Sequence, residues 1–282
     1  MSVIQRQWVD HDIPALDYFN PDRYRENQAN MSYTALFYSA WRRLIGAYLL
    51  SFGLSFFCGI FFIEIFRVAP ETLFEISTKR LSYAVPVFDF GAKLGIDNGI
   101  VLFAWNGLGA LATISMLYGA PLFNPDNLSL FPQTIRKAFC GTRKMKLLCF
   151  LPGCSVIEEE AHRRVYVWLM VPWLGMILLG VESGLAVSTS AHIFGSYVMG
   201  IVSLIPHGVV EIPAISFAGA VTFAAHLLVR KHAGGERDGE LFAELENYKR
   251  SVPLQKCVPG VLLFLLIAGL VEGHVSLGIL GL

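Results

Sequence analysis

Charged residues are scarce in this sequence of 282 residues. Asp, Glu, Lys and Arg make up 16% of it, against about a quarter in an average soluble domain, and 54% of the residues are hydrophobic. The mean hydropathy of +0.54 excludes an ordinary soluble domain. Basic and acidic residues balance at 22 each, so the composition gives no reason to expect a nucleic-acid partner.

The sequence also lacks the motifs that announce catalysis or cofactor binding. No Walker A, G-x-S-x-G, G-x-G-x-x-G or H-E-x-x-H pattern occurs. The five cysteines are an odd number in a long chain and predict no disulfide framework. Cys140, Cys149, Cys154 and His162 match no zinc spacing, which favours free thiols. We therefore expect no enzyme activity, no catalytic residue, no metal and no cofactor.

Long apolar runs are what the sequence has instead. Five of them reach the roughly 17–25 residues that cross a bilayer as a helix. The predicted spans are 44–66, 99–118, 165–187, 207–229 and 258–280. We predict an all-α polytopic membrane helix bundle over residues 44–282. The polar residues 1–43 show no signal peptide and are predicted to form a cytoplasmic arm, with the mature chain beginning at or near Met1.

A sixth apolar segment, residues 191–205, is short for a crossing. If it does not span, 18 Lys and Arg residues lie on one side of the membrane and 4 on the other. If it spans, the totals become 12 and 10, which fits the positive-inside rule poorly. The count predicts a re-entrant half-helix over 191–205 that returns at Pro206. In a plasma membrane, the amino-terminus is then cytoplasmic and the carboxyl-terminus outside.

Residues 67–97 link the first two spans and alternate apolar and charged residues at near-helical spacing. Pro70 and Pro86 interrupt the pattern. It suits an interfacial amphipathic helix on the outer face, and an ordinary packed connecting loop fits equally well.

Ionisable groups at membrane depth are expensive and face the bundle interior, so they form the default candidate site. His207 and Glu211 lie one helical turn apart and share a face. Pro206 and Pro213 flank them and predict a helix break. The full predicted polar cluster comprises Asn98, Asn106, Glu182, His207, Gly208, Glu211, Glu272 and His274.

Three interpretations of the His207 and Glu211 pair stay open. The two side chains bond each other and neighbouring carbonyls as structural glue, handle a metal or a proton, or form part of a docking site for a partner helix or a lipid. The run Ser188–Ser190 beside His192 invites a nucleophile interpretation, but hydroxyls capping a helix end explain it better.

Two segments resemble the stage II sporulation protein M family of polytopic membrane proteins. LIPHGVVEIPAISFAGAVTF (Leu204–Phe223) resembles that family's signature of Pro-His-Gly, a glutamate and a small-residue helix. AGLVEGHVS (Ala268–Ser276) is similar to its last helix, and Asn98 to the asparagine that opens its second helix. By resemblance, the motif positions are Asn98, His207, Gly208, Glu211 and Glu272.

The best-known members of that family hold peptidoglycan-degrading enzymes at a membrane. The resemblance therefore implies a noncatalytic scaffold or accessory subunit whose partners are other membrane proteins, with lipid and a second copy of the chain left open. A transporter or channel with its polar site at the Pro206 break is the alternative. A weaker one is an intramembrane metal enzyme using His207, Glu211, Glu272 and His274.

Overall fold

A computed structural model of the chain describes residues 33–123, 157, 160–232 and 238–276, and within these ranges the secondary structure is helical. The long helices are α2 (Tyr33–Glu64), α5 (Asn98–Gly119), α9 (Glu160–Ile193), α10 (Tyr197–His232) and α12 (Leu254–Val271). The shorter elements are α3 (Pro70–Thr78), η2 (Lys79–Tyr83), α4 (Val85–Lys93), η3 (Ala120–Phe123), α11 (Asp238–Ser251) and the π-helical turn η5 (Glu272–Ser276).

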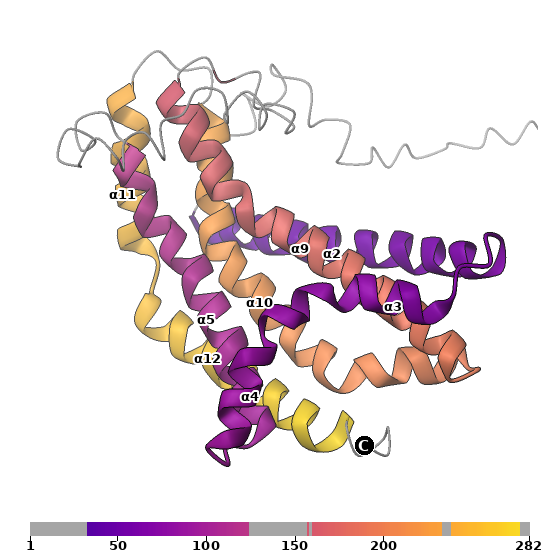
Figure 1. Cartoon of the computed structure of the whole chain (residues 1–282). Coiled ribbons are helices and arrows are strands. Elements are labelled where there is room, and N and C mark those ends of the chain that lie inside the picture. Colours follow the sequence, from indigo (N-terminus) through magenta and orange to yellow (C-terminus); the bar gives the residue numbers. More distant parts are fainter. Residues whose placement is uncertain (1–32, 124–156, 158–159, 233–237, 277–282) are drawn as a thin grey trace, which may run out of the picture.

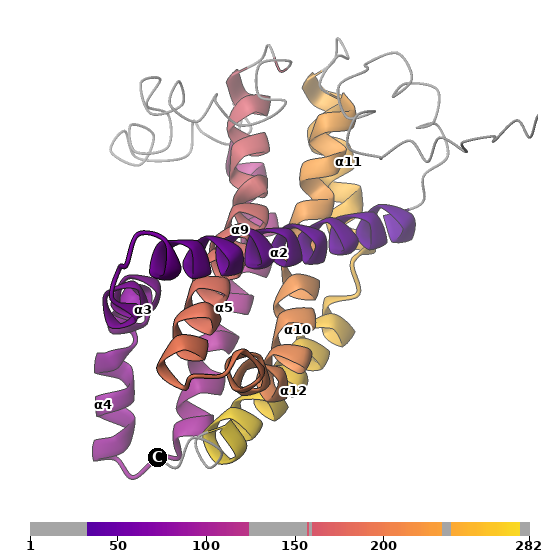
Figure 2. The same ribbon diagram turned by 90° about the vertical axis from the view of Figure 1, so that its right-hand side faces the viewer.

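Five described helices are long and apolar enough to cross a membrane, which confirms the predicted helical bundle. Their span windows lie in Tyr33–Glu64, Asn98–Gly119, Ala161–Ile193, Gly208–Lys231 and Leu254–His274. The α10 window is 78% buried within the protein, whereas those of α2, α5 and α12 are 22–28% buried. α10 is thus the central helix, and α2 runs across the bundle rather than alongside α5 (Figures 1 and 2).

Helix α2 begins at Tyr33, well before the predicted span at Leu44. Its buried residues recur every three or four positions in a single stripe: Leu36, Ala40, Leu44, Tyr48, Ser51, Ser55, Gly59 and Ile63. Arg42 and Arg43 lower the local hydropathy, but they do not interrupt this stripe. The last residues of the predicted arm are therefore the first turns of the helix, while residues 1–32 lie outside the described part.

Small residues bring α2 and α9 into close contact. A Cβ atom at Gly180 would lie 2.5 Å from the Tyr48 carbonyl oxygen, and one at Gly184 would lie 2.9 Å from the Phe56 nitrogen. The Ser55 hydroxyl donates to the Gly180 carbonyl across this contact at 3.2 Å. Close backbone approach through Gly and Ser is the usual way in which membrane helices pack, and it fixes the relative position of these two helices.

Glycines also join α5 to α12. A Cβ at Gly99 would lie 2.6 Å from the Gly269 carbonyl oxygen, and one at Gly273 would lie 2.8 Å from the Gly99 nitrogen. Asp97 caps α5 by accepting a hydrogen bond from the Gly99 amide at 2.8 Å. This contact holds η5 and its Glu272 against the start of α5.

The segment predicted as one amphipathic helix or a loop, residues 67–97, contains two short α-helices, α3 and α4, with the 3-10 helix η2 between them. α3 buries Leu73 and Ser77 and packs on α9. α4 lies beside the start of α5 (Figures 1 and 2), where Gly91 faces Val101. Pro70 and Pro86 stand in the first turns of these helices, a position in which proline is well tolerated, so the prolines start two helices rather than breaking one.

The expected half-helix over 191–205 needs correction. Residues 191–193 end α9, Phe194–Ser196 form a turn, and the helix that follows continues from Tyr197 to His232. Pro206 and Pro213 therefore lie inside α10, and neither starts a new helix. A proline removes one hydrogen bond and bends a helix that tertiary packing holds on both sides. α10 indeed changes direction along its length in Figure 1, and its apolar span window starts at Gly208.

The helix α11 lies between α10 and α12 in the sequence. It turns Leu241, Leu245 and Tyr248 into the core. The Tyr248 hydroxyl donates to the Val221 carbonyl of α10 at 2.9 Å, and burial raises the pKa of Tyr248, so the hydroxyl remains a donor.

Candidate functional site

Glu211 lies at the centre of the polar residues predicted from the sequence. The Asn106 amide of α5 donates to the Glu211 carboxylate of α10 at 2.9 Å. Glu272 of η5 and Tyr48 of α2 are near enough to Glu211 for electrostatic interaction. Four elements distant in sequence thus meet at one carboxylate.

Helix packing explains why these residues meet. The Thr222 hydroxyl of α10 donates to the Thr113 carbonyl of α5 at 2.6 Å, two turns further along from Asn106 and three from Glu211. The glycine contact between α5 and α12 places η5 beside the first turn of α5. Trp41 of α2 donates to the Ser216 hydroxyl of α10 at 2.9 Å. The carboxylate is therefore held between helices whose relative positions are fixed by contacts above and below it.

Other predicted members lie elsewhere. Asn98 is exposed in the first turn of α5, and Glu182 is partly buried on α9. His274 is exposed, and its Nε2 atom lies 3.4 Å from Asp97 Oδ2. Gly208 lies in α10 next to Leu204. Asn98 and His274 are therefore surface residues.

The side chains of Pro206 and His207 lie outside the described part, so the contact between His207 and Glu211 stays a prediction. No group of three or more His, Cys, Asp or Glu side chains in the described ranges is arranged to hold a metal ion. Cys140, Cys149 and Cys154 fall outside those ranges. What the described geometry offers chemically is a hydrogen-bonded carboxylate inside a helix bundle.

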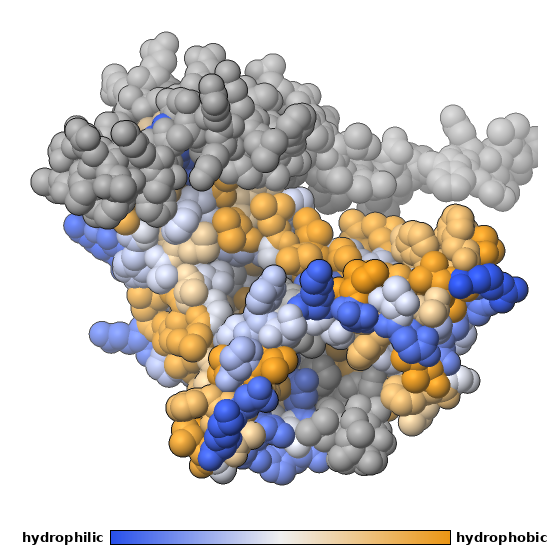
Figure 3. Space-filling model, viewed as in Figure 1, coloured by the Kyte–Doolittle hydropathy of each residue, from blue (hydrophilic) through white to orange (hydrophobic). Residues whose placement is uncertain are grey.

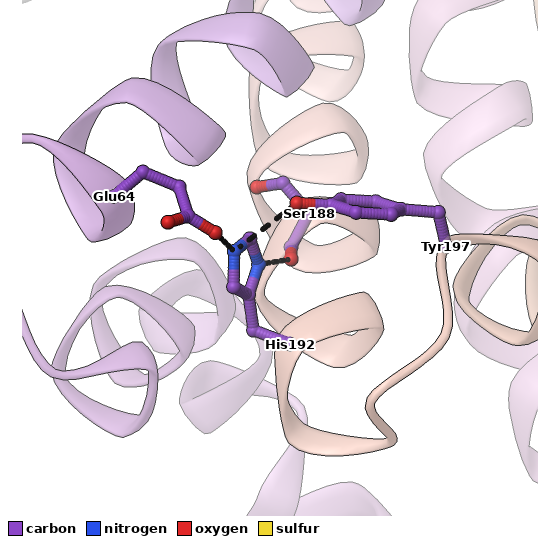
Figure 4. Close-up of polar contacts among 4 residues, drawn as sticks. All are labelled: Glu64, Ser188, His192 and Tyr197. Carbon is purple, nitrogen blue, oxygen red and sulfur yellow. Dashed lines mark hydrogen bonds and ion pairs between the residues drawn. The ribbon is translucent and has the colours of Figure 1, made fainter.

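A second polar cluster was missed by the sequence analysis. His192, near the end of α9, lies 3.1 Å from Glu64 at the end of α2 and 3.3 Å from the hydroxyl of Tyr197 at the start of α10 (Figure 4). Its other ring nitrogen lies 2.8 Å from the Ser188 carbonyl oxygen. The predicted topology could have indicated this cluster, because Glu64 and His192 lie near the ends of two spans that are predicted to end on the same side of the membrane.

The expected role of Ser188–Ser190 as hydroxyls that cap a helix end needs correction, because these residues lie inside α9, which continues to Ile193. Ser188 and Thr189 are fully buried and donate to carbonyls one turn back in their own helix. Another residue overlooked in the sequence is His226 on α10, which is 2% exposed. Its Nδ1 atom lies 2.9 Å from the Tyr166 carbonyl oxygen, and its ring stacks on Phe223, which indicates a structural role at the contact of α9 with α10.

Many large hydrophobic side chains are exposed on the described helices, and hydrophobic residues form patches on the face drawn in Figure 3. Together with five apolar helices and polar side chains gathered between them, this surface defines a polytopic helical membrane protein. The profile of the Stage II sporulation protein M (SpoIIM) family matches residues 49–277, and the chain belongs to that family. No curated protein and no solved structure matches the chain.

Proposed function

We propose that this protein is a noncatalytic scaffold or accessory subunit of a membrane protein assembly, in the plasma membrane with its amino-terminus in the cytoplasm and its carboxyl-terminus outside. The observation that carries the proposal is the outward face of α2. A Cβ added at Gly46 or Gly53 would meet nothing within 4 Å, so both glycines face away from the protein. Leu50 and Phe57 lie on the same face and are 67% and 68% exposed.

This face, which we call the α2 stripe (Gly46, Leu50, Gly53 and Phe57), has the features of a membrane helix contact. Two glycines seven residues apart fall on one line of the helix and let a second backbone approach closely. The neighbouring large side chains would fill the spaces beside that backbone. Within the chain, the inward stripe of α2 uses the same small-residue packing against α9. The occupant that fits the α2 stripe is a transmembrane helix of a partner protein.

A matched pair of glycines tests the proposal. Gly53→Leu adds bulk to the α2 stripe, and Gly109→Leu adds the same bulk to α5 at a position where a Cβ also meets nothing within 4 Å. Both variants should fold, because both sites are open. We expect Gly53→Leu to lose the membrane proteins that co-purify with the wild type in mild detergent and Gly109→Leu to keep them. Equal retention by both variants would contradict the docking role of α2.

A transporter is the second candidate, favoured by the Glu211 carboxylate that accepts from Asn106 inside the bundle with Glu272 nearby. Intramembrane carboxylates often mark ion pathways. Cation or proton flux into liposomes that hold the wild-type protein, lost in Glu211→Gln, would support transport. The scaffold proposal predicts no flux above that of empty liposomes.

A further inference from the structure

Three helices meet at the cluster drawn in Figure 4. Glu64 ends α2, His192 lies one residue before the end of α9, and Tyr197 begins α10. The cluster sits one turn beyond the place where Gly59 of α2 packs against Ser188 of α9. It therefore lies at the end of the close contact between α2 and α9.

Hydrogen-bond chemistry fixes where the protons are in this cluster. His192 Nδ1 lies 2.8 Å from the Ser188 carbonyl oxygen, and a carbonyl can only accept, so Nδ1 carries a hydrogen. In a neutral imidazole, Nε2 is then an acceptor. Its neighbour at 3.1 Å is a Glu64 carboxylate oxygen, which is also an acceptor when ionised. Two acceptors cannot bond each other, so a hydrogen bond between these two groups requires one further proton.

Among the described residues, Glu64 is the charged group that contacts His192. The His192 side chain is 14% exposed and that of Glu64 is 53% exposed. The charged residues that follow Glu64 as far as the end of α3, which packs on α9, are Arg67 in the link and Glu71 and Glu75 of α3. None of them forms an ion pair with His192 in the described ranges. Tyr197 contributes a hydroxyl 3.3 Å from Nε2.

We propose that Glu64 and His192 form a proton-binding site that clasps the end of α2 to α9 when it is protonated and frees this end of α2 when the proton leaves. With the proton bound, the ring donates to the Ser188 carbonyl and shares its second hydrogen with Glu64. Without it, the carboxylate and the Nε2 lone pair repel each other, and the more exposed Glu64 turns to water. The Tyr197 hydroxyl then donates to Nε2 in its place.

The same arrangement recurs at a second point and serves as an internal comparison. His274 Nδ1 lies 3.0 Å from the Leu270 carbonyl oxygen, and its Nε2 lies 3.4 Å from Asp97 Oδ2. Here the side chains are 61% and 41% exposed, so water screens the interaction. Glu272 on the same turn and Glu211 of α10 are the other acidic groups on the elements packed against it. We expect this pair to affect stability less than the pair of Glu64 and His192.

The protonation state can be observed directly by ¹⁵N NMR of the full chain labelled at histidine, with the His192 signals assigned by their loss in His192→Gln. Histidine ordinarily changes charge between about pH 5 and 8. At the acid end we expect both ring nitrogens of His192 to carry hydrogen, and at the alkaline end only Nδ1. A neutral ring with its hydrogen on Nε2 across this range would overturn the proposal.

Glu64→Gln tests the clasp itself, because a glutamine amide can donate to the unprotonated Nε2. We expect the melting temperature of the wild type in detergent to fall as the pH rises through this range, and that of Glu64→Gln to lack this fall. His274→Gln, the control at the exposed pair, should retain most of the wild-type fall. An equal pH dependence in the wild type and Glu64→Gln would overturn the proposal, even if both fold normally.

Discussion

At the scale of single residues, glycine decides how closely α2 and α9 approach. A Cβ at Gly184 would overlap the Phe52 carbonyl oxygen, whereas a Cβ at Gly175, on the same helix, would meet nothing within 4 Å. We expect Gly184→Ala to destabilise the protein by about 1–3 kcal/mol, as overpacking does elsewhere. Gly175→Ala should instead stabilise it by up to about 1 kcal/mol through helix propensity. Thermal unfolding in detergent measures both, and a matching loss in the two variants would contradict the close contact.

The hydrogen bond between Asn106 and Glu211 is the second feature at this scale. Double-mutant cycles on hydrogen bonds between membrane helices give about 0.6 kcal/mol on average and about 1.7 kcal/mol at most. We expect a coupling in that range between Asn106→Ala and Glu211→Gln, measured by unfolding in detergent. Strict additivity of the two substitutions would show that the contact at 2.9 Å contributes nothing. The same cycle with His207→Ala tests the predicted pairing of His207 with Glu211.

At the scale of elements, three helices are followed by a residue in the left-handed backbone conformation. The residues after α2, α4 and α9 that have positive φ are Arg67 (56°), Gly95 (69°) and Gly195 (65°). After Gly95 and Gly195 the next amide bonds a carbonyl five residues back, as in a Schellman motif, whereas after Arg67 the Val68 amide bonds the Phe62 carbonyl, six residues back. Two of the three positions hold glycine, which adopts this conformation without strain, and one holds arginine.

Arg67 therefore offers a test of this geometry. A side chain in the left-handed region costs roughly 1–2 kcal/mol, so Arg67→Gly should stabilise the protein by about 1 kcal/mol. Arg67→Ala removes the same charge and keeps the Cβ, and we expect it to be near neutral. The difference in melting temperature between these two variants isolates the backbone effect. A less stable Arg67→Gly than Arg67→Ala would show that the turn is not strained.

The number of membrane-spanning helices could be predicted from the sequence, but the helix boundaries and the contacts between helices could not. Five spans follow from apolar runs of sufficient length, because the thickness of the bilayer sets this length whatever the helices pack against. The course of α10 through Pro206 did not follow, because packing around a proline decides whether a helix ends or bends. Asn106 and Glu211 were both identified from their cost in the membrane, but their pairing depends on how α5 meets α10. Glu64 escaped notice for the same reason, since its partner His192 lies on a distant segment.

At the scale of the whole molecule, orientation is the first prediction. The 18 to 4 distribution of Lys and Arg places Ser190 and Gly239 on opposite sides of the membrane. The apolar window Gly208–Lys231 lies between them and is long and apolar enough for the crossing. Single cysteines at these two positions, in a background without other cysteines, should react with an impermeant reagent from opposite sides. Reaction from the same side would mean that residues 191–205 cross the membrane as well.

The α2 stripe carries the central claim, that this protein acts by holding a partner's helix. A photoreactive amino acid at Phe57 in the native membrane tests the claim most directly, with Leu263 of α12 as a control that is 56% exposed. We predict adducts to another membrane protein from position 57 and none from position 263. Adducts that consist solely of a second copy of this chain, or equal yields from the two positions, would contradict the account.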